Sequence, residues 1–263
     1  MTDGFPAVVD TAWVAEHLGE EKLLVADVRG PNAHTRGHIP GSVPLVLGAP
    51  GQFTDRDVLE AFAAEAALRL RRHGVTGEER LVLYDVGDCV SAASALLVAE
   101  LAGHPRVAVM AGGLMGWQGD LETGPVELEK TRSELQPRLD AVATREEIAR
   151  RLGEPGFLLL DARREDEFTG KGGYPCDPRQ GHIPGAQRVE NAELFEAPGR
   201  PRAAEEVRAV VGAPDDADIV TYCHSGSRSG LAVIALRAAG YRARNYLGSW
   251  HEWSRHPELP AGR

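Results

Sequence analysis

The chain has 263 residues, of which 43% are hydrophobic and 26% are charged, and its formal net charge is −10. This length favours two domains, and the negative charge argues against a nucleic-acid-binding surface, which needs clustered lysine and arginine. No apolar run is long enough to span a membrane and no signal-peptide pattern opens the sequence, so we expect a cytoplasmic protein without membrane partners.

Three cysteines, Cys89, Cys176 and Cys223, form an odd and sparse set without CxxC spacing. This pattern predicts neither a disulfide framework nor a structural zinc site, and free thiols in a reducing compartment fit it better. The glycines are scattered in turns and never form GxGxxG after a strand. We therefore expect no metal, nucleotide or flavin cofactor.

Four motifs occur twice along the chain, in the same order. The pairs are LLVADVR (23–29) with FLLLDAR (157–163), RGHIPGSV (36–43) with QGHIPGAQ (180–187), RLVLYD (80–85) with DIVTYC (218–223), and GGLMGW (112–117) with GSWHEW (248–253). Such ordered repetition predicts two copies of one domain. We place the copies at residues 1–124 and 138–263, joined by a polar linker at 125–137 that is bounded by two prolines.

Short apolar runs alternate with helical patterns in each copy. In the second copy the sequence predicts helices at 144–152, 205–212 and 229–240 and strands at 157–162 and 218–222. Thr144 and Glu147 form a capping-box pattern at the first helix, and Gly240 closes the last one. This alternation predicts the α/β class, with a mainly parallel sheet covered by helices. The longest insertion of the second copy is TGKGGYPCDPRQ (169–180).

Cys223 stands at the carboxyl end of a predicted strand, where parallel sheets bind their ligands. The turn that follows leads into a helix at about Ser229, and its backbone N–H groups and helix dipole favour an anion. In the same loop, Gly226 allows a close approach to the backbone that a side chain would block. Ser225 and Ser227 add hydroxyl donors, and Arg228 adds a positive charge. A thiol held there should be a nucleophilic thiolate. The alternative, a buried structural cysteine, leaves the Ser-Gly-Ser-Arg sequence unexplained.

TYCHSGSRSG, together with the DAR, GHIPGA and GSWHEW motifs, resembles the rhodanese family of sulfurtransferases. The doubled arrangement resembles tandem thiosulfate and 3-mercaptopyruvate sulfurtransferases over nearly the whole chain. The resemblance implies two tandem rhodanese-like domains, each a mainly parallel five-stranded sheet flanked by helices. It also implies a ping-pong reaction in which Cys223 takes a sulfane sulfur from a small-molecule donor and passes the persulfide sulfur to cyanide, a small thiol or a protein thiol.

The first copy differs from the second at the decisive positions. Asp85 matches Cys223, and Val90 matches Arg228. A carboxylate cannot store sulfur and would compete with an anionic substrate, so we expect the first domain to be catalytically inactive. Cys89 matches Ser227 in this alignment and should not replace the nucleophile.

Further residues complete the predicted site. His224 is expected to bind substrate with its loop, and Ser249 and Trp250, which have no match in the first copy, are expected to line the pocket. Trp253 matches Trp117 and is expected to pack in the core.

Residues of the first copy also enter this prediction through the resemblance. It implies that Asp27 and His38 approach the cleft between the domains and contribute to substrate binding or proton handling. In the second copy, Glu167 departs from the family pattern, because some members carry an arginine there. Anion binding would then rest mainly on the loop amides and Arg228.

Several functions remain open at this point. Thiosulfate is the favoured donor, because sulfite leaves without a proton and the loop lacks the Gly-Ser-Gly-Val-Thr pattern of sequences that resemble mercaptopyruvate enzymes. A 3-mercaptopyruvate sulfurtransferase and a persulfide carrier or regulatory module that does not turn over are the alternatives. A phosphatase is disfavoured, because phosphatases with this fold place the arginine six positions after the cysteine, whereas here it is five.

Overall fold

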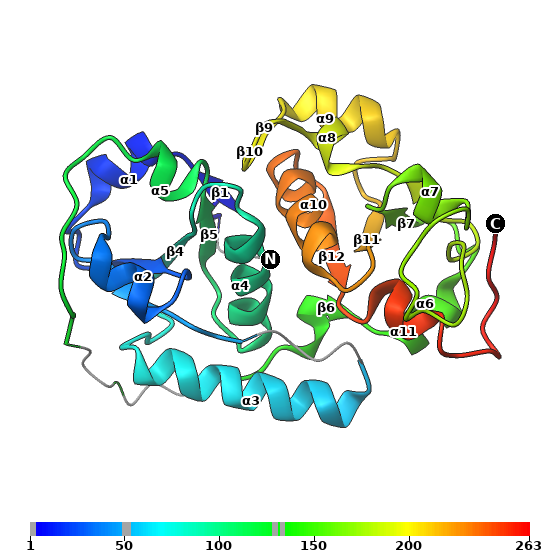
Figure 1. Cartoon of the computed structure of the whole chain (residues 1–263), viewed down its shortest axis with the longest axis horizontal. Coiled ribbons are helices and arrows are strands. Elements are labelled where there is room, and N and C mark those ends of the chain that lie inside the picture. Colours follow the sequence, from blue (N-terminus) through cyan, green and yellow to red (C-terminus); the bar gives the residue numbers. More distant parts are fainter. Residues whose placement is uncertain (1–3, 49–53, 128–130, 132–134) are drawn as a thin grey trace. The chain divides into compact units, whose positions relative to one another are not determined.

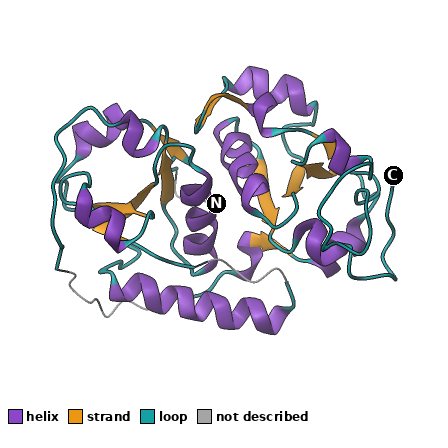
Figure 2. Ribbon diagram, viewed as in Figure 1, coloured by secondary structure: helices purple, strands orange, loops and turns teal. Residues whose placement is uncertain are grey.

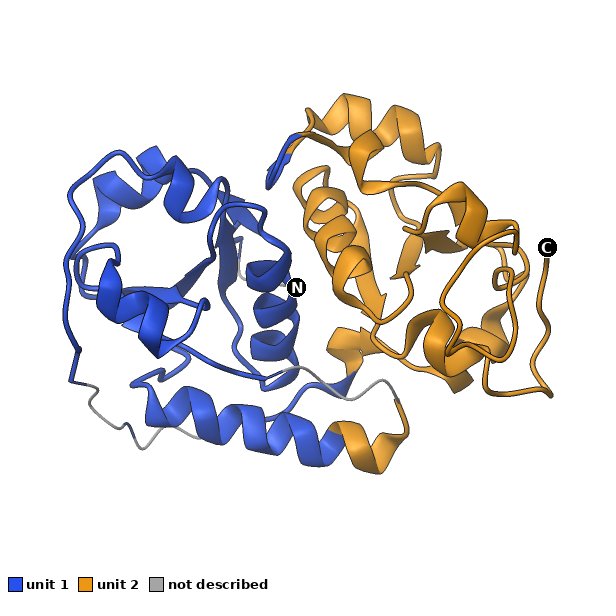
Figure 3. Ribbon diagram, in the orientation of Figure 1, with its two compact units in different colours: residues 1–49, 60–139, 197–200 blue, residues 50–59, 140–196, 201–263 orange. Residues whose placement is uncertain are grey.

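A computed structural model describes residues 4–48, 54–127, 131 and 135–263 of the chain. Part of the predicted linker, 125–137, lies outside the described residues. The chain divides into two compact units, one formed by 1–49, 60–139 and 197–200 and the other by 50–59, 140–196 and 201–263 (Figure 3). The domain boundaries derived from the repeats, 1–124 and 138–263, stay a prediction.

The elements of the first half alternate between short strands and helices (Figure 1). The strands are β1 (Val8–Val9), β2 (Leu23–Asp27), β3 (Val43–Pro44), β4 (Arg80–Tyr84) and β5 (Val107–Met110). The helices are α1 (Thr11–His17), α2 (Pro31–Arg36), α3 (Arg56–Arg72), α4 (Val90–Leu101) and α5 (Gly113–Gly116).

The second half repeats this alternation. Its strands are β6 (Val142–Ala143), β7 (Phe157–Asp161), β8 (Gln187–Arg188), β9 (Phe195–Ala197), β10 (Arg200–Pro201), β11 (Asp218–Tyr222) and β12 (Arg242–Tyr246). Its helices are the 3-10 turn η1 (Leu139–Ala141), α6 (Arg145–Arg151), α7 (Glu165–Phe168), α8 (Asn191–Leu194), α9 (Ala204–Val211), α10 (Ser227–Ala238) and α11 (Ser249–Trp253).

Each unit is built on a parallel five-stranded sheet flanked by helices (Figure 2). The strand orders are β1-β5-β4-β2-β3 and β6-β12-β11-β7-β8, so the second sheet repeats the first strand by strand. Helix α4 packs on β4 and β5, and α10 packs on β11 and β12. The predicted fold is therefore confirmed. Among the described residues, no helix combines the length and apolarity needed to cross a bilayer.

The helix ends follow the predicted signals with two corrections. Thr144 Oγ1 caps α6 by accepting the N–H of Glu147, but the Glu147 carboxylate pairs with Arg244, so only half of the capping box forms. Helix α10 begins at Ser227, two residues before the predicted start, because Gly226 caps it in a left-handed conformation with φ 90°.

The two Asp-x-Arg motifs tie the end of a central strand to the neighbouring GHIPG turn. Arg163 Nε donates to Asp161 Oδ1 at 2.9 Å, and its Nη2 donates to the carbonyl oxygen of Gly181 at 2.6 Å. Both side chains are buried. In the first unit, Arg29 makes the corresponding bonds to Asp27 and to the Gly37 carbonyl. Burying such a pair is tolerated because each charge is paired and hydrogen-bonded. The motif therefore holds the loops at the carboxyl ends of the strands.

Candidate active site

Cys223 directly follows β11 and is 1% exposed. Its Sγ accepts the backbone N–H of Gly226 at 3.1 Å, immediately before the first turn of α10. A side chain at position 226 would bring a Cβ within 3.0 Å of the Leu247 carbonyl oxygen and would strain the positive φ. The sulfur thus accepts a backbone N–H immediately before a helix start, a position that favours a negative charge.

The loop from β12 into α11 holds the Cys223 backbone in place. Cys223 N–H donates to Ser249 Oγ at 3.1 Å, and Ser249 Oγ donates to the Tyr246 carbonyl oxygen at 2.8 Å. The Trp250 N–H donates in turn to the Cys223 carbonyl oxygen at 3.0 Å. Ser249 adopts φ 53°, which is uncommon for a residue with a side chain. The Ser249 side chain therefore holds the backbone of Cys223.

Trp250 lies in the hydrophobic core of the second unit rather than on an open surface. It is fully buried among the side chains around Tyr222 and Trp253, and its Nε1 donates to the Arg179 carbonyl oxygen. Trp253 is buried in the same core, as expected. The pocket-lining role of Trp250 stays a prediction.

The charge of Arg228 is balanced within the second unit. Its Nη1 and Nη2 donate to the two oxygens of Glu167, at 2.7 and 2.9 Å. Glu167 lies on α7 and its side chain is 2% exposed, whereas the Arg228 side chain is 32% exposed. Burial by itself would raise the pKa of the Glu167 carboxyl, but the hydrogen bonds from Arg228 outweigh it and the pKa is lowered. The carboxylate is therefore ionised at neutral pH and competes for the guanidinium with any anionic substrate.

The remaining loop residues are nearer to solvent. Ser225 is half-buried and Ser227 is exposed. The His224 ring stacks on Tyr174 with 3.7 Å between centroids, and its Nε2 lies 3.2 Å from Asp177 Oδ2. Burial lowers the pKa of His224, although the Asp177 carboxylate opposes this shift, so the ring is neutral at pH 7. The sequence analysis did not identify Tyr174 and Asp177 as site residues. Both lie in the 169–180 insertion, and the length of this insertion was the only sequence feature that pointed to them.

In the first unit, a carboxylate occupies the corresponding loop. Asp85 Oδ1 accepts the N–H groups of Gly87 and Cys89, at 2.9 and 3.1 Å, and Oδ2 accepts those of Ser91 and Ala92, both at 3.1 Å. Asp85 is buried. The backbone donors that would surround a substrate anion are thus satisfied within the chain itself.

The structure corrects the alignment of these two loops. Cys89, with φ 61°, is the residue that precedes α4, just as Gly226 precedes α10. Cys89 therefore matches Gly226 rather than Ser227, and Ser91 rather than Val90 takes the place of Arg228, because the first loop has one extra residue. Burial raises the pKa of the Cys89 thiol to about 12. This thiol is not a nucleophile at neutral pH.

Asp27 and His38 are both buried and bonded within the first unit. Asp27 accepts hydrogen bonds from Arg29 and from the Tyr84 hydroxyl. The His38 ring stacks on His34 with 3.7 Å between centroids, and its Nδ1 lies 2.8 Å from the His34 carbonyl oxygen. Their contribution to substrate binding or proton handling stays a prediction.

Comparison with known proteins identifies the family. The rhodanese-like domain matches residues 10–120 and again residues 144–256. The chain belongs to the rhodanese family. Its relatives include the "Probable 3-mercaptopyruvate sulfurtransferase" of Pseudomonas aeruginosa, 32% identical with 94% of each chain covered. The sulfur carrier protein TtuD of Thermus thermophilus is 30% identical, with 97% of this chain and 96% of that protein covered.

A solved structure shares the fold of this chain. The crystal structure of a probable thiosulfate sulfurtransferase superposes with a TM-score of 0.77 at 30% identity, covering 92% of this chain and 98% of that one. These three similar proteins therefore carry three different functional names.

Replacing the carboxylate of the first loop by a thiol tests whether that loop can be made reactive. We expect Asp85→Cys to create no second turnover site, because Ser91 supplies no cation where the second loop has Arg228 and the loop is one residue longer. Turnover with thiosulfate and cyanide, measured per chain, should stay at the wild-type value. A variant that binds two sulfurs and doubles the rate would contradict this reading of the first loop.

The Glu167–Arg228 pair predicts opposite effects for its two members. Glu167→Gln should free the guanidinium for the donor and lower KM for thiosulfate about fivefold, since one nearby charge changes binding by about 1 kcal/mol at a partly exposed site. Arg228→Ala should raise KM or lower kcat by about one to two decades, the loss of a charge-assisted contact. Glu165→Gln, an exposed carboxylate on the same helix, is the control and should change neither constant. A KM that rises in Glu167→Gln while the variant stays folded would show that the pair does not compete with the donor.

Proposed function

We propose that the protein is a sulfurtransferase that carries a sulfane sulfur as a persulfide on Cys223. The observation that supports this most directly is the position of Cys223 Sγ, at the end of β11 and against the Gly226 N–H at the start of α10. Membership of the rhodanese family, with relatives named as sulfurtransferases, supports the same reaction class. The first copy, whose loop is filled by the Asp85 carboxylate, takes no part in the chemistry.

The reaction runs in two halves, with the Cys223 persulfide form of the enzyme between them. The Cys223 thiolate attacks the outer sulfur of thiosulfate, the S–S bond breaks, and sulfite leaves with the bonding electron pair. Cyanide or a thiolate then attacks the terminal persulfide sulfur, and the Cys223 thiolate returns as the leaving group. No external oxidant or reductant is needed, because in each half the attacking group supplies the electron pair of the new bond and the leaving group takes the pair of the broken S–S bond.

The surrounding residues have separate roles in this proposal. The Gly226 N–H and the start of α10 stabilise the thiolate and the persulfide anion. Arg228, in competition with Glu167, draws the anionic donor, while His224, Ser225 and Ser227 border it. Ser249 positions the nucleophile by holding its N–H.

Thiosulfate is the proposed donor, because sulfite is a stable leaving anion that needs positive potential and no proton. The second candidate is 3-mercaptopyruvate, whose carbon must gain a proton when pyruvate leaves. It is favoured by the contact between His224 and Asp177 beside the nucleophile and by the name of the Pseudomonas aeruginosa relative. The third is a persulfide carrier that hands sulfur to a protein thiol, favoured by the likeness to TtuD. We place the protein in the cytoplasm, where its three free cysteines stay reduced.

Steady-state kinetics with thiosulfate and cyanide test this proposal. A persulfide intermediate predicts parallel lines in double-reciprocal plots and no turnover in Cys223→Ser. The ratio of kcat/KM for thiosulfate to that for 3-mercaptopyruvate should exceed one. A ratio below one would replace the donor but keep the reaction class, whereas one transfer followed by arrest would favour the carrier.

A further inference from the structure

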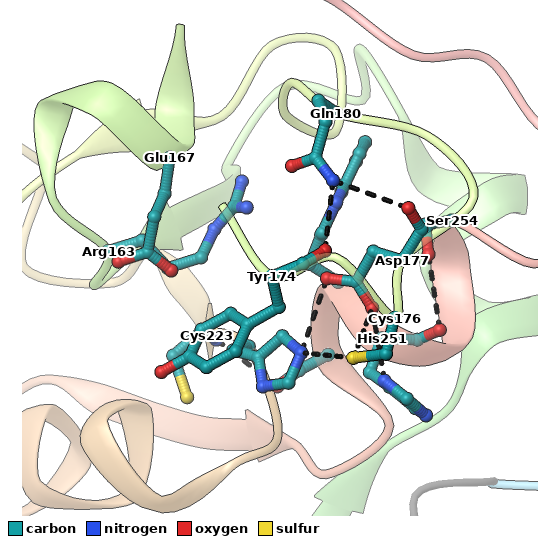
Figure 4. A network of polar contacts seen from close by, with 12 residues as sticks. Arg163, Glu167, Tyr174, Cys176, Asp177, Gln180, Cys223, His251 and Ser254 are labelled. Carbon is teal, nitrogen blue, oxygen red and sulfur yellow. Dashed lines mark hydrogen bonds and ion pairs between the residues drawn. The ribbon is translucent and has the colours of Figure 1, made fainter. Parts of the chain in front are cut away.

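We propose that Cys176, Asp177, His224 and His251 form a zinc site beside the active-site loop. One ligand atom from each of these residues lies within 4.8 Å of those of the other three. Cys176 and Asp177 come from the 169–180 insertion, His224 follows Cys223, and His251 lies on α11. Figure 4 shows Cys176, Asp177 and His251 gathered in one network.

The distances within this group suit a tetrahedral ion. His224 Nε2 lies 3.2 Å from Asp177 Oδ2 and 3.9 Å from Cys176 Sγ. His251 Nδ1 lies 3.1 Å from Asp177 Oδ1. In a zinc site with bonds of about 2.0–2.3 Å, neighbouring ligand atoms are roughly 3.3–3.8 Å apart. The four ligand atoms all lie within 4.8 Å of one another, so shifts of up to about 1 Å would bring them around one ion.

Asp177 supplies a second observation, which does not depend on the clustering. Its side chain is 1% exposed, and within the described part of the chain its Oδ2 accepts no hydrogen bond, although His224 Nε2 is close by. A buried carboxylate oxygen without a donor is costly. A cation bound by both Oδ2 and Nε2 would satisfy the two atoms together.

Arg255 contacts two of the four proposed ligand residues, Asp177 and Cys176. Its Nη1 lies 3.2 Å from Asp177 Oδ1, and its Nη2 donates to the Cys176 carbonyl oxygen at 2.7 Å. These contacts fix the two adjacent ligand residues and leave Oδ2 for the ion, as outer partners do in metal sites. They also place a positive charge near the site.

The ligand set selects the metal. One thiolate and two imidazoles favour a borderline-soft ion over Mg²⁺ or Ca²⁺, which prefer oxygen ligands. One thiolate and one carboxylate balance the charge of Zn²⁺. Bound there, the ion would join the insertion to the residue that follows the nucleophile and to the start of α11.

Cobalt(II) is the probe, because four-coordinate Co²⁺ shows visible ligand-field bands and a thiolate-to-metal charge-transfer band. We expect the reduced, metal-stripped protein to bind one Co²⁺ per chain with both features, and Zn²⁺ to displace it. Cys176→Ser should lose the charge-transfer band, while Cys176→His should keep the ligand-field bands without it. Asp177→Asn and His251→Gln should weaken binding at least tenfold.

Two cysteine variants serve as matched controls. Cys89→Ser and Cys223→Ser should both keep the charge-transfer band, and circular dichroism should show that every variant is folded. A band that survives in Cys176→Ser but disappears in Cys223→Ser would place the metal on the nucleophile and overturn the proposal. Absence of one-to-one Co²⁺ binding would overturn it too and leave the four residues as a proton-sharing network. Neither result depends on turnover, so the proposed sulfur transfer is tested separately.

Discussion

The convergence of backbone N–H groups at the end of a central parallel strand is the constraint on which both halves of this protein depend. A strand that turns abruptly into a helix leaves these donors unpaired, and they must find an anion or water. In the second unit Cys223 Sγ takes the Gly226 N–H, and in the first the Asp85 carboxylate takes four N–H groups. The two loops thus differ in the group that meets these donors, a thiol sulfur in the second unit and a carboxylate in the first.

The fold could be predicted from sequence because its signals are local and doubled. Apolar runs that end in Asp-x-Arg or in a tyrosine mark the central strands. Each pattern occurs twice and in the same order, which chance similarity does not produce. The position of Cys223 between a strand end and a helix start could be predicted from the glycine, the small polar residues and the helical pattern that follow it. All of these residues lie within about ten positions of one another, and over so short a segment a strand, a tight turn and a helix leave few possible backbone conformations.

What could not be predicted depends on contacts between distant residues. The sequence identified Glu167 as a departure from the family pattern. Its hydrogen bonds to Arg228 join positions 61 residues apart, and no local sequence pattern predicts them. The extra residue before α4 was missed because Cys89 adopts a conformation that glycine usually takes. Asp177 meets His224 only once the 169–180 insertion folds over the active-site loop.

The position of the transferred sulfur tests the central claim most directly. After incubation with thiosulfate and removal of the excess, intact-mass measurement and peptide mapping should find one added sulfur per chain, on the peptide that contains Cys223. Cys89→Ser and Cys176→Ser should retain that sulfur, and Cys223→Ser should carry none. Sulfur bound to the Cys223→Ser protein, or mapped to Cys89 or Cys176 in the wild type, would contradict the account.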